Sequence, residues 1–182
     1  MTGAQPGLDL EPVVWPRTAE RAGFSTQPLV ALQMEQAYWR AFLDSAVLFD
    51  QASDFLDDLR IAGIPVVIVT DLTAQIQFRK IIHFGLDRLV DWVVTSEEVG
   101  SEKPSGANFE LALAKLGGVE GAVWMVGENA AKDIGGARAA VDAVGIQKRH
   151  EGVRLGEGAD APDAVFDNFH EIRRLLSRVL AP

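Results

Sequence analysis

The sequence contains no cysteine among its 182 residues, which excludes both a disulfide framework and a thiolate nucleophile within the chain. It is also poor in basic residues, with 17 Lys and Arg against 26 Asp and Glu, and its formal net charge is -9. We expect no nucleic-acid partner, because binding to nucleic-acid phosphates needs a basic face. The longest apolar run, residues 64–69, is too short to span a bilayer, and residues 1–12 do not resemble a signal peptide. These absences favour a cytoplasmic protein with no membrane partner.

Apolar, β-branched runs alternate with amphipathic stretches along most of the chain. Residues 65–70 read Pro-Val-Val-Ile-Val-Thr, a pattern typical of a strand buried on both faces of a parallel sheet. Further strands are expected at residues 92–94, 122–126, 144–147 and 164–166, with helices between them. This alternation predicts an open, mostly parallel α/β sheet with helices on both faces. We expect residues 49–182 to form this core and residues 1–48 to form a separate N-terminal segment.

Short polar residues and glycines indicate where the expected helices begin and how they pack. Thr73, Ser105 and Asn168 each stand just before an amphipathic stretch, where their side chains would cap a helix. Gly135 and Gly136 lie inside a helix expected at residues 132–141, where they would permit close packing. A nucleotide-cofactor domain is disfavoured, because no Gly-x-Gly-x-x-Gly follows any expected strand.

The residues that follow the expected strands are the candidates for a site, because ligands of open α/β sheets bind outside the carboxyl ends of the strands. The candidates are Thr70 and Asp71 after the first strand, Lys103 after the second, and Glu128, Asn129 and Asp133 after the third. Taken singly, each has an ordinary explanation: β propensity for the threonine, solvent exposure for the lysine, and a helix dipole for the acids. Their order and spacing together are more specific.

An apolar strand ending in Thr, a later Lys-Pro, and an apolar strand leading into Gly-acid-x4-Asp resemble motifs II, III and IV of the haloacid dehalogenase (HAD) superfamily. The stretch DLTAQIQFRKIIHFGLDRLVDWVVTSEEVGSEKP is similar to the segment that joins motifs II and III in phosphatases with a helical cap. WMVGENAAKDIGGARAA resembles motif IV and its helix, and AYWRAFLDSAVLFDQASDFLDDLRIAGIP resembles the last cap helix and the return to the core. The resemblance implies a HAD-like, Rossmannoid core with a reduced helical cap at the N-terminus.

The resemblance also implies a role for each candidate in hydrolysis of a small phosphorylated molecule. Thr70 would donate its hydroxyl to a phosphoryl oxygen, and Lys103 would neutralise the phosphoryl charge. Asp71 and Asn129 would contact the substrate near the mouth of the same crevice. Glu128 and Asp133 would hold Mg²⁺, although the family usually has Asp at the position of Glu128.

Motif I of the family, a strand followed by Asp-x-Asp, has two possible counterparts near the N-terminus. In one alignment Asp9 is the nucleophile, but residues 4–7 before it contain Pro and Gly and do not read as a buried strand. In the other, residues 13–15 form the strand, and Pro16 and Thr18 occupy the aspartate positions. The second alignment is favoured because it supplies a strand.

The motif I strand lies centrally in the family's sheet, so its absence would expose two strand edges that residues 8–15 or another chain would have to fill. Two functions stay open at this point. The first is a Mg²⁺-dependent phosphohydrolase that uses Asp9 or a partner's aspartate, and the second is a non-catalytic HAD-fold protein that binds a ligand or a protein. Trp15 and Trp39 lie in the segment that a full cap would cover, and their exposure would favour a homodimer.

Overall fold

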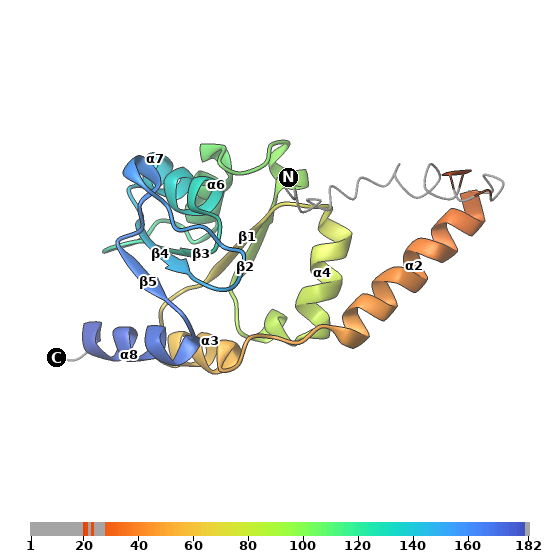
Figure 1. Ribbon diagram of the computed structural model, residues 1–182. Coiled ribbons are helices and arrows are strands. Elements are labelled where there is room, and N and C mark those ends of the chain that lie inside the picture. The colour runs from red at the N-terminus through yellow and green to blue at the C-terminus, as the bar shows by residue number, and fades with distance from the viewer. Residues whose placement is uncertain (1–19, 22, 24–27, 181–182) are drawn as a thin grey trace. The chain divides into compact units, whose positions relative to one another are not determined.

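The computed structural model describes residues 20–21, 23 and 28–180, and the chain divides into two compact units, Met1–Val47 and Leu48–Pro182. The first unit contains the helix α2 (Pro28–Ser45). The second alternates strands and helices (Figure 1). Its elements are α3 (Ala52–Ile61), β1 (Val67–Thr70), α4 (Ala74–His83), β2 (Trp92–Thr95), α5 (Ser96–Val99), α6 (Gly106–Lys115), β3 (Trp124–Gly127), α7 (Gly136–Val141), β4 (Val144–Lys148), β5 (Ala164–Phe166) and α8 (Phe169–Val179). No described helix is long and apolar enough to cross a membrane.

The strands pair in parallel, as the β-branched runs predict, but they form two ladders. In the first, β1 pairs with β2 from Val67 opposite Trp92 to Thr70 opposite Thr95. In the second, β4 lies between β3 and β5, and Gly127 at the end of β3 stands opposite Gln147. Because the pairing is parallel, the carboxyl ends of paired strands lie at the same edge of the sheet. The candidate residues come directly after these strand ends, in the connections that leave that edge.

The two ladders share their helical layers, so they belong to one α/β unit. On one face, Phe55 of α3 and Ile172 of α8 belong to a buried cluster against which Val66, the residue before β1, and Trp124 of β3 pack. On the other face, Phe109 of α6 and Ala137 of α7 form a cluster contacted by Val69, Val123 and Met125 (the two helical layers are visible in Figure 1). Apolar residues in or next to β1 and β3 therefore pack against both helical layers.

Four strand edges have no strand partner among the described residues, and two of them belong to β1 and β3. β1 pairs only with β2, and β3 pairs only with β4. Every residue of β1 and β3 is only partly buried, whereas β4 is buried from Gly145 to Lys148. The pattern of residues 65–70 predicted full burial on both faces, and the open edge explains the difference, since a strand with a neighbour on one side keeps its other side accessible. Residues 8–15, expected to fill such a gap, and Asp9 with them, lie outside the described residues.

In the N-terminal unit, α2 runs from Pro28 to Ser45 and includes the residues AYWRAFLDS, which resemble part of the last cap helix. Trp39, in the middle of this helix, is only 4% exposed, and its ring contacts the rings of Tyr38 and Phe42. The condition of an exposed Trp39 is therefore not met, and Trp15 lies outside the described residues. The homodimer stays a prediction without support from Trp39.

The three helices begin where the sequence predicts, but only one of the three predicted side-chain caps is present. Asn168 caps α8 as predicted, since its side chain accepts a hydrogen bond from the backbone of Glu171. Ser105 and Thr73 precede α6 and α4 but make no side-chain cap, so these two predicted caps are wrong. The backbone N–H of Ala74 instead donates to Glu97 Oε2 at 2.7 Å.

The two glycines of the third βα connection allow close packing, as expected. A Cβ on Gly136 would lie 2.9 Å from Pro104 Cβ and 3.0 Å from Phe109, and one on Gly135 would clash with Asp160. The expected helix at 132–141 is split into a π-helical turn, Ala130–Gly135, followed by α7. This turn carries Asp133 and sets its position.

The long-range cap of α4 predicts an unequal response to two substitutions. Glu97→Ala should lower the free energy of unfolding by about 0.5–2 kcal/mol, because it removes the acceptor for the Ala74 N–H. Thr73→Ala should change it by less than about 0.5 kcal/mol, because the Thr73 side chain makes no cap. Urea denaturation of both variants measures the difference, and a larger loss in Thr73→Ala would contradict the assignment.

Candidate functional site

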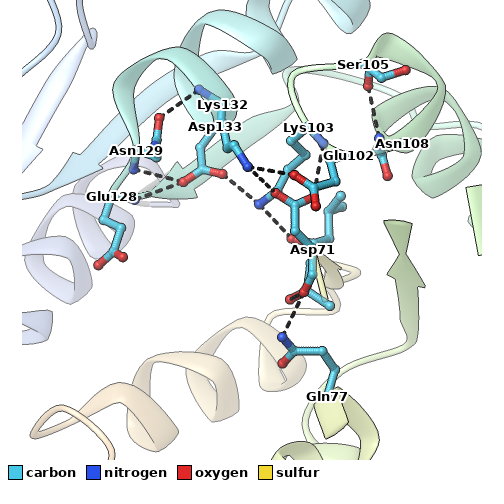
Figure 2. Close-up of polar contacts among 12 residues, drawn as sticks. Asp71, Gln77, Glu102, Lys103, Ser105, Asn108, Glu128, Asn129, Lys132 and Asp133 are labelled. Atoms are coloured by element: carbon cyan, nitrogen blue, oxygen red, sulfur yellow. Dashed lines mark hydrogen bonds and ion pairs between the residues drawn. The ribbon is translucent and has the colours of Figure 1, made fainter. Parts of the chain in front are cut away.

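Charged side chains from three βα connections meet at the carboxyl ends of β1, β2 and β3, as Figure 2 shows. We name this group the strand-end site. Its members are Asp71 from the connection after β1, Glu102 and Lys103 from the connection after β2, and Lys132 and Asp133 from the connection after β3. The parallel register explains the convergence, because segments distant in sequence leave the ladders at the same edge.

Lys103 lies at the centre of the strand-end site and contacts both ladders. Its ammonium donates to Asp133 Oδ1 at 2.7 Å and to the carbonyl of Val69 in β1 at 3.1 Å. Its backbone N–H donates to Asp71 Oδ1 at 3.0 Å. The Lys103 side chain is 12% exposed and that of Asp133 is 8% exposed, so this ion pair is largely shielded from water. An ammonium has three N–H donors, and the described residues accept from two of them.

Asp133 is held so tightly that the sequence around it is constrained. Its Oδ2 accepts hydrogen bonds from the backbone N–H groups of Glu128 at 3.2 Å and Asn129 at 2.9 Å. A Cβ on Gly127 would lie 2.5 Å from the same oxygen, so only glycine fits at the end of β3. Gln147, fully buried in β4, supports this loop by donating to the Glu128 carbonyl at 2.9 Å. The Gly-acid-x4-Asp spacing thus encodes a loop that wraps one carboxylate.

Asp71 connects the strand-end site to Lys132. The Lys132 ammonium lies 3.2 Å from Asp71 Oδ2 and 3.0 Å from Glu102 Oε2. The hydrogen bond to Glu102, joined by the one to Asp71, raises the pKa of Lys132 above its ordinary value, so this side chain stays charged at neutral pH. The carbonyl of Asp71 accepts from Gln77 Nε2 and from the Thr70 hydroxyl. In this arrangement the single hydroxyl proton of Thr70 serves the loop, and its donation to a phosphoryl oxygen stays a prediction.

The backbone after Asp71 is strained. Leu72 has a φ of 87°, a region that costs a non-glycine residue on the order of 1–3 kcal/mol. The two hydrogen bonds to the Asp71 carbonyl hold the loop in this geometry. Non-glycine residues persist there when the surrounding contacts determine the backbone, which is common at binding loops.

The two carboxylates expected to hold Mg²⁺ are not brought together. Glu128 points away from Asp133 in Figure 2, and its Oε2 lies 2.8 Å from Nε2 of His150, at the end of β4. Asp133 faces Lys103 instead. Among the described residues, no group of three His, Asp or Glu side chains could hold a metal ion. In the described part of the chain, Glu128 and Asp133 therefore do not form the Mg²⁺ site that the resemblance implies.

The sequence located part of the strand-end site. It identified Asp71, Lys103 and Asp133, which the structure brings together, whereas Asn129 is exposed and contributes its backbone N–H to Asp133 and its side chain to the Lys132 backbone. It missed Glu102 and Lys132. Each directly precedes a motif residue, Lys103 or Asp133, and this pairing of opposite charges was the available signal.

A family model described as haloacid dehalogenase-like hydrolase matches residues 17–140. The chain belongs to this family. The resemblance carried by motifs II to IV is confirmed, and the convergence of Asp71, Lys103 and Asp133 gives those motifs one location in the HAD-like unit.

Two curated relatives of this HAD-like chain are phosphatases. It is 41% identical over 123 residues to ribulose-1,5-bisphosphate 5-phosphatase of Halopiger xanaduensis, and this match covers 68% of this chain and 50% of that protein. It is 32% identical over 126 residues to phosphoserine phosphatase of Thermus thermophilus, covering 69% of this chain and 49% of that protein. The chain thus spans about half the length of the curated relatives it matches.

Solved structures support the fold. A HAD phosphatase from Thermococcus onnurineus matches with a TM-score of 0.68 at 20% identity, over 91% of this chain and 87% of that chain. A 2-haloacid dehalogenase from Pseudomonas syringae matches with a TM-score of 0.69 at 23% identity, over 92% and 70%. The predicted HAD-like α/β fold is confirmed.

The difference in burial between the two lysines predicts different effects on stability. Lys103→Met should lower the free energy of unfolding by about 2–4 kcal/mol, because it leaves the buried Asp133 carboxylate without its ammonium. Lys132→Met, at a side chain that is 41% exposed, should cost less than about 1 kcal/mol. Chemical denaturation followed by tryptophan fluorescence measures both, and equal losses would contradict the central role of Lys103.

Proposed function

We propose that this HAD-like domain binds the phosphoryl group of a small phosphate ester at the strand-end site and serves its hydrolysis. The observation that carries the proposal is the Lys103 ammonium, which is shielded from water, joins β1 to Asp133, and retains one N–H beyond the two accepted by described residues. A charge-assisted hydrogen bond from such a donor is about twice as strong as a neutral one. In a chain of net charge -9, this local cation offsets the repulsion that an anionic ligand would meet.

The substrate class follows from the relatives. Those named above are phosphatases of ribulose bisphosphate and of phosphoserine, both small and phosphorylated. We place this chain in the same broad class and in the cytoplasm, which its lack of cysteine suits. The attacking carboxylate would come from Asp9 or from another chain, since Asp71 and Asp133 are both bound by lysines.

The second candidate is a non-catalytic phosphate-ester binder. It is favoured by one observation: each carboxylate of the strand-end site, namely Asp71, Glu102 and Asp133, is engaged by a lysine ammonium within 3.2 Å. A carboxylate so engaged is a poor nucleophile, because attack would require giving up the ion pair. Binding through Lys103 would survive without turnover.

Phosphate release from a panel of small phosphate esters, measured with and without Mg²⁺, tests the proposal. We expect release by the wild-type chain and its loss in Lys103→Ala, whereas loss in Asp9→Asn as well would identify Asp9 as the nucleophile. Arg60→Ala, which removes an exposed pair with Asp57 on α3, is the matched control and should release phosphate at the wild-type rate.

The variants separate the candidate sources of the nucleophile. Release that survives in Asp9→Asn but not in Lys103→Ala would remove Asp9 and leave the site in place. Absence of release in the wild type, combined with phosphate binding by calorimetry, would favour the non-catalytic candidate. Absence of both would refute the proposed function.

A further inference from the structure

Each carboxylate of the strand-end site has a lysine partner, and this pairing bears on whether a Mg²⁺ ion can bind there. Mg²⁺ sites in proteins are octahedral and use one or two carboxylates that are free to coordinate the ion. At the strand-end site, Asp71 and Glu102 are paired with Lys132, and Asp133 is paired with Lys103. Each carboxylate of the strand-end site thus already has an ammonium partner, and a divalent cation bound there would compete with a lysine.

Asp133 is the most buried of these carboxylates and the most constrained. One oxygen accepts from Lys103 and the other from two backbone N–H groups. Oδ2 also lies close to Gly127, because a Cβ added to that glycine would be 2.5 Å from this oxygen. A metal ion bound to Asp133 would also stand a few ångströms from the Lys103 ammonium, and the repulsion would be strong because both groups are shielded from water.

The backbone and the side chain of Glu128 contact different residues. Its backbone N–H faces Asp133, while its carboxylate lies 2.8 Å from His150 Nε2. His150 is itself held by a 3.1 Å hydrogen bond from Nδ1 to the Glu151 carbonyl and by its ring contact with Phe49. The side-chain amide of Gln147 in β4 donates to the Glu128 carbonyl, so β4 contacts the Glu128 backbone as well.

We propose that the strand-end site binds phosphate with Lys103 as its cation and without a divalent metal, and that Glu128 belongs to a pair with His150 outside the phosphate site. This inference rests on the proposed function for the ligand class. The inference goes beyond the proposed function in one respect: no divalent metal assists Lys103 in neutralising the phosphoryl group.

Calorimetric titration of the full chain with orthophosphate, in buffer containing Mg²⁺ and in buffer containing EDTA, tests the inference. We expect the dissociation constants to agree within about twofold, because no metal takes part in binding. Titration with Mg²⁺ alone should give no saturable heat. Lys103→Met should weaken phosphate binding by about 10- to 100-fold, the equivalent of one charge-assisted hydrogen bond.

Glu128→Gln is the matched variant, because it neutralises the carboxylate that the Mg²⁺ interpretation requires and leaves the length of the side chain unchanged. Phosphate affinity within about twofold of wild type, in both buffers, is the expected result. Lys103→Arg, which retains a cation, should bind more tightly than Lys103→Met, and circular dichroism confirms that the variants are folded.

The outcomes distinguish the two proposals. Phosphate binding that appears only with Mg²⁺ and is lost in Glu128→Gln would overturn this inference and leave the proposed function intact. Phosphate binding absent from both buffers would refute both. Binding that is equal in both buffers but unaffected in Lys103→Met and Lys103→Arg would remove Lys103 from the site and overturn the inference as well.

Discussion

The ion pair between Lys103 and Asp133 is the interaction on which the arrangement of the site depends. It joins the end of the β1–β2 ladder, through the Val69 carbonyl, to the loop that follows β3. The two ladders share no strand-to-strand hydrogen bonds among the described residues, so the polar link between their carboxyl ends is made by side chains. Apolar packing on the two helical layers supplies the rest, but packing is non-directional and would not by itself fix where the loops meet.

A second constraint is electrical. The chain has an excess of acid, yet its strand-end site pairs each carboxylate with a lysine, and only a local cation makes an anionic ligand acceptable there. Lys132 increases this effect by holding Asp71 and Glu102 at the mouth, with a pKa raised by those partners. At the strand-end site three carboxylates therefore share two ammonium groups.

The open edges of β1 and β3 are the third feature that shapes the molecule. Unpaired edges leave backbone N–H and C=O groups available to another strand, and natural proteins usually cover them. Both strands are accordingly only half-buried despite their apolar, β-branched sequences. The curated relatives are about twice the length that the chain covers, so the HAD-like unit described is one portion of the architecture those proteins have.

The sequence by itself determined the elements and the family. The β-branched run at residues 65–70 predicted a strand, because β propensity is a local property. The glycine pair at 135 and 136 predicted close packing. The spacing of Thr70, Lys103 and Asp133 indicated the family. What only the tertiary structure decided is which partner each charged group takes. Glu128 faces His150 instead of Asp133, and Glu97 instead of Thr73 caps α4. Sequence spacing could not reveal either, because a side chain's partner depends on the direction in which its loop leaves the sheet, and that direction is set by contacts with residues far away along the chain.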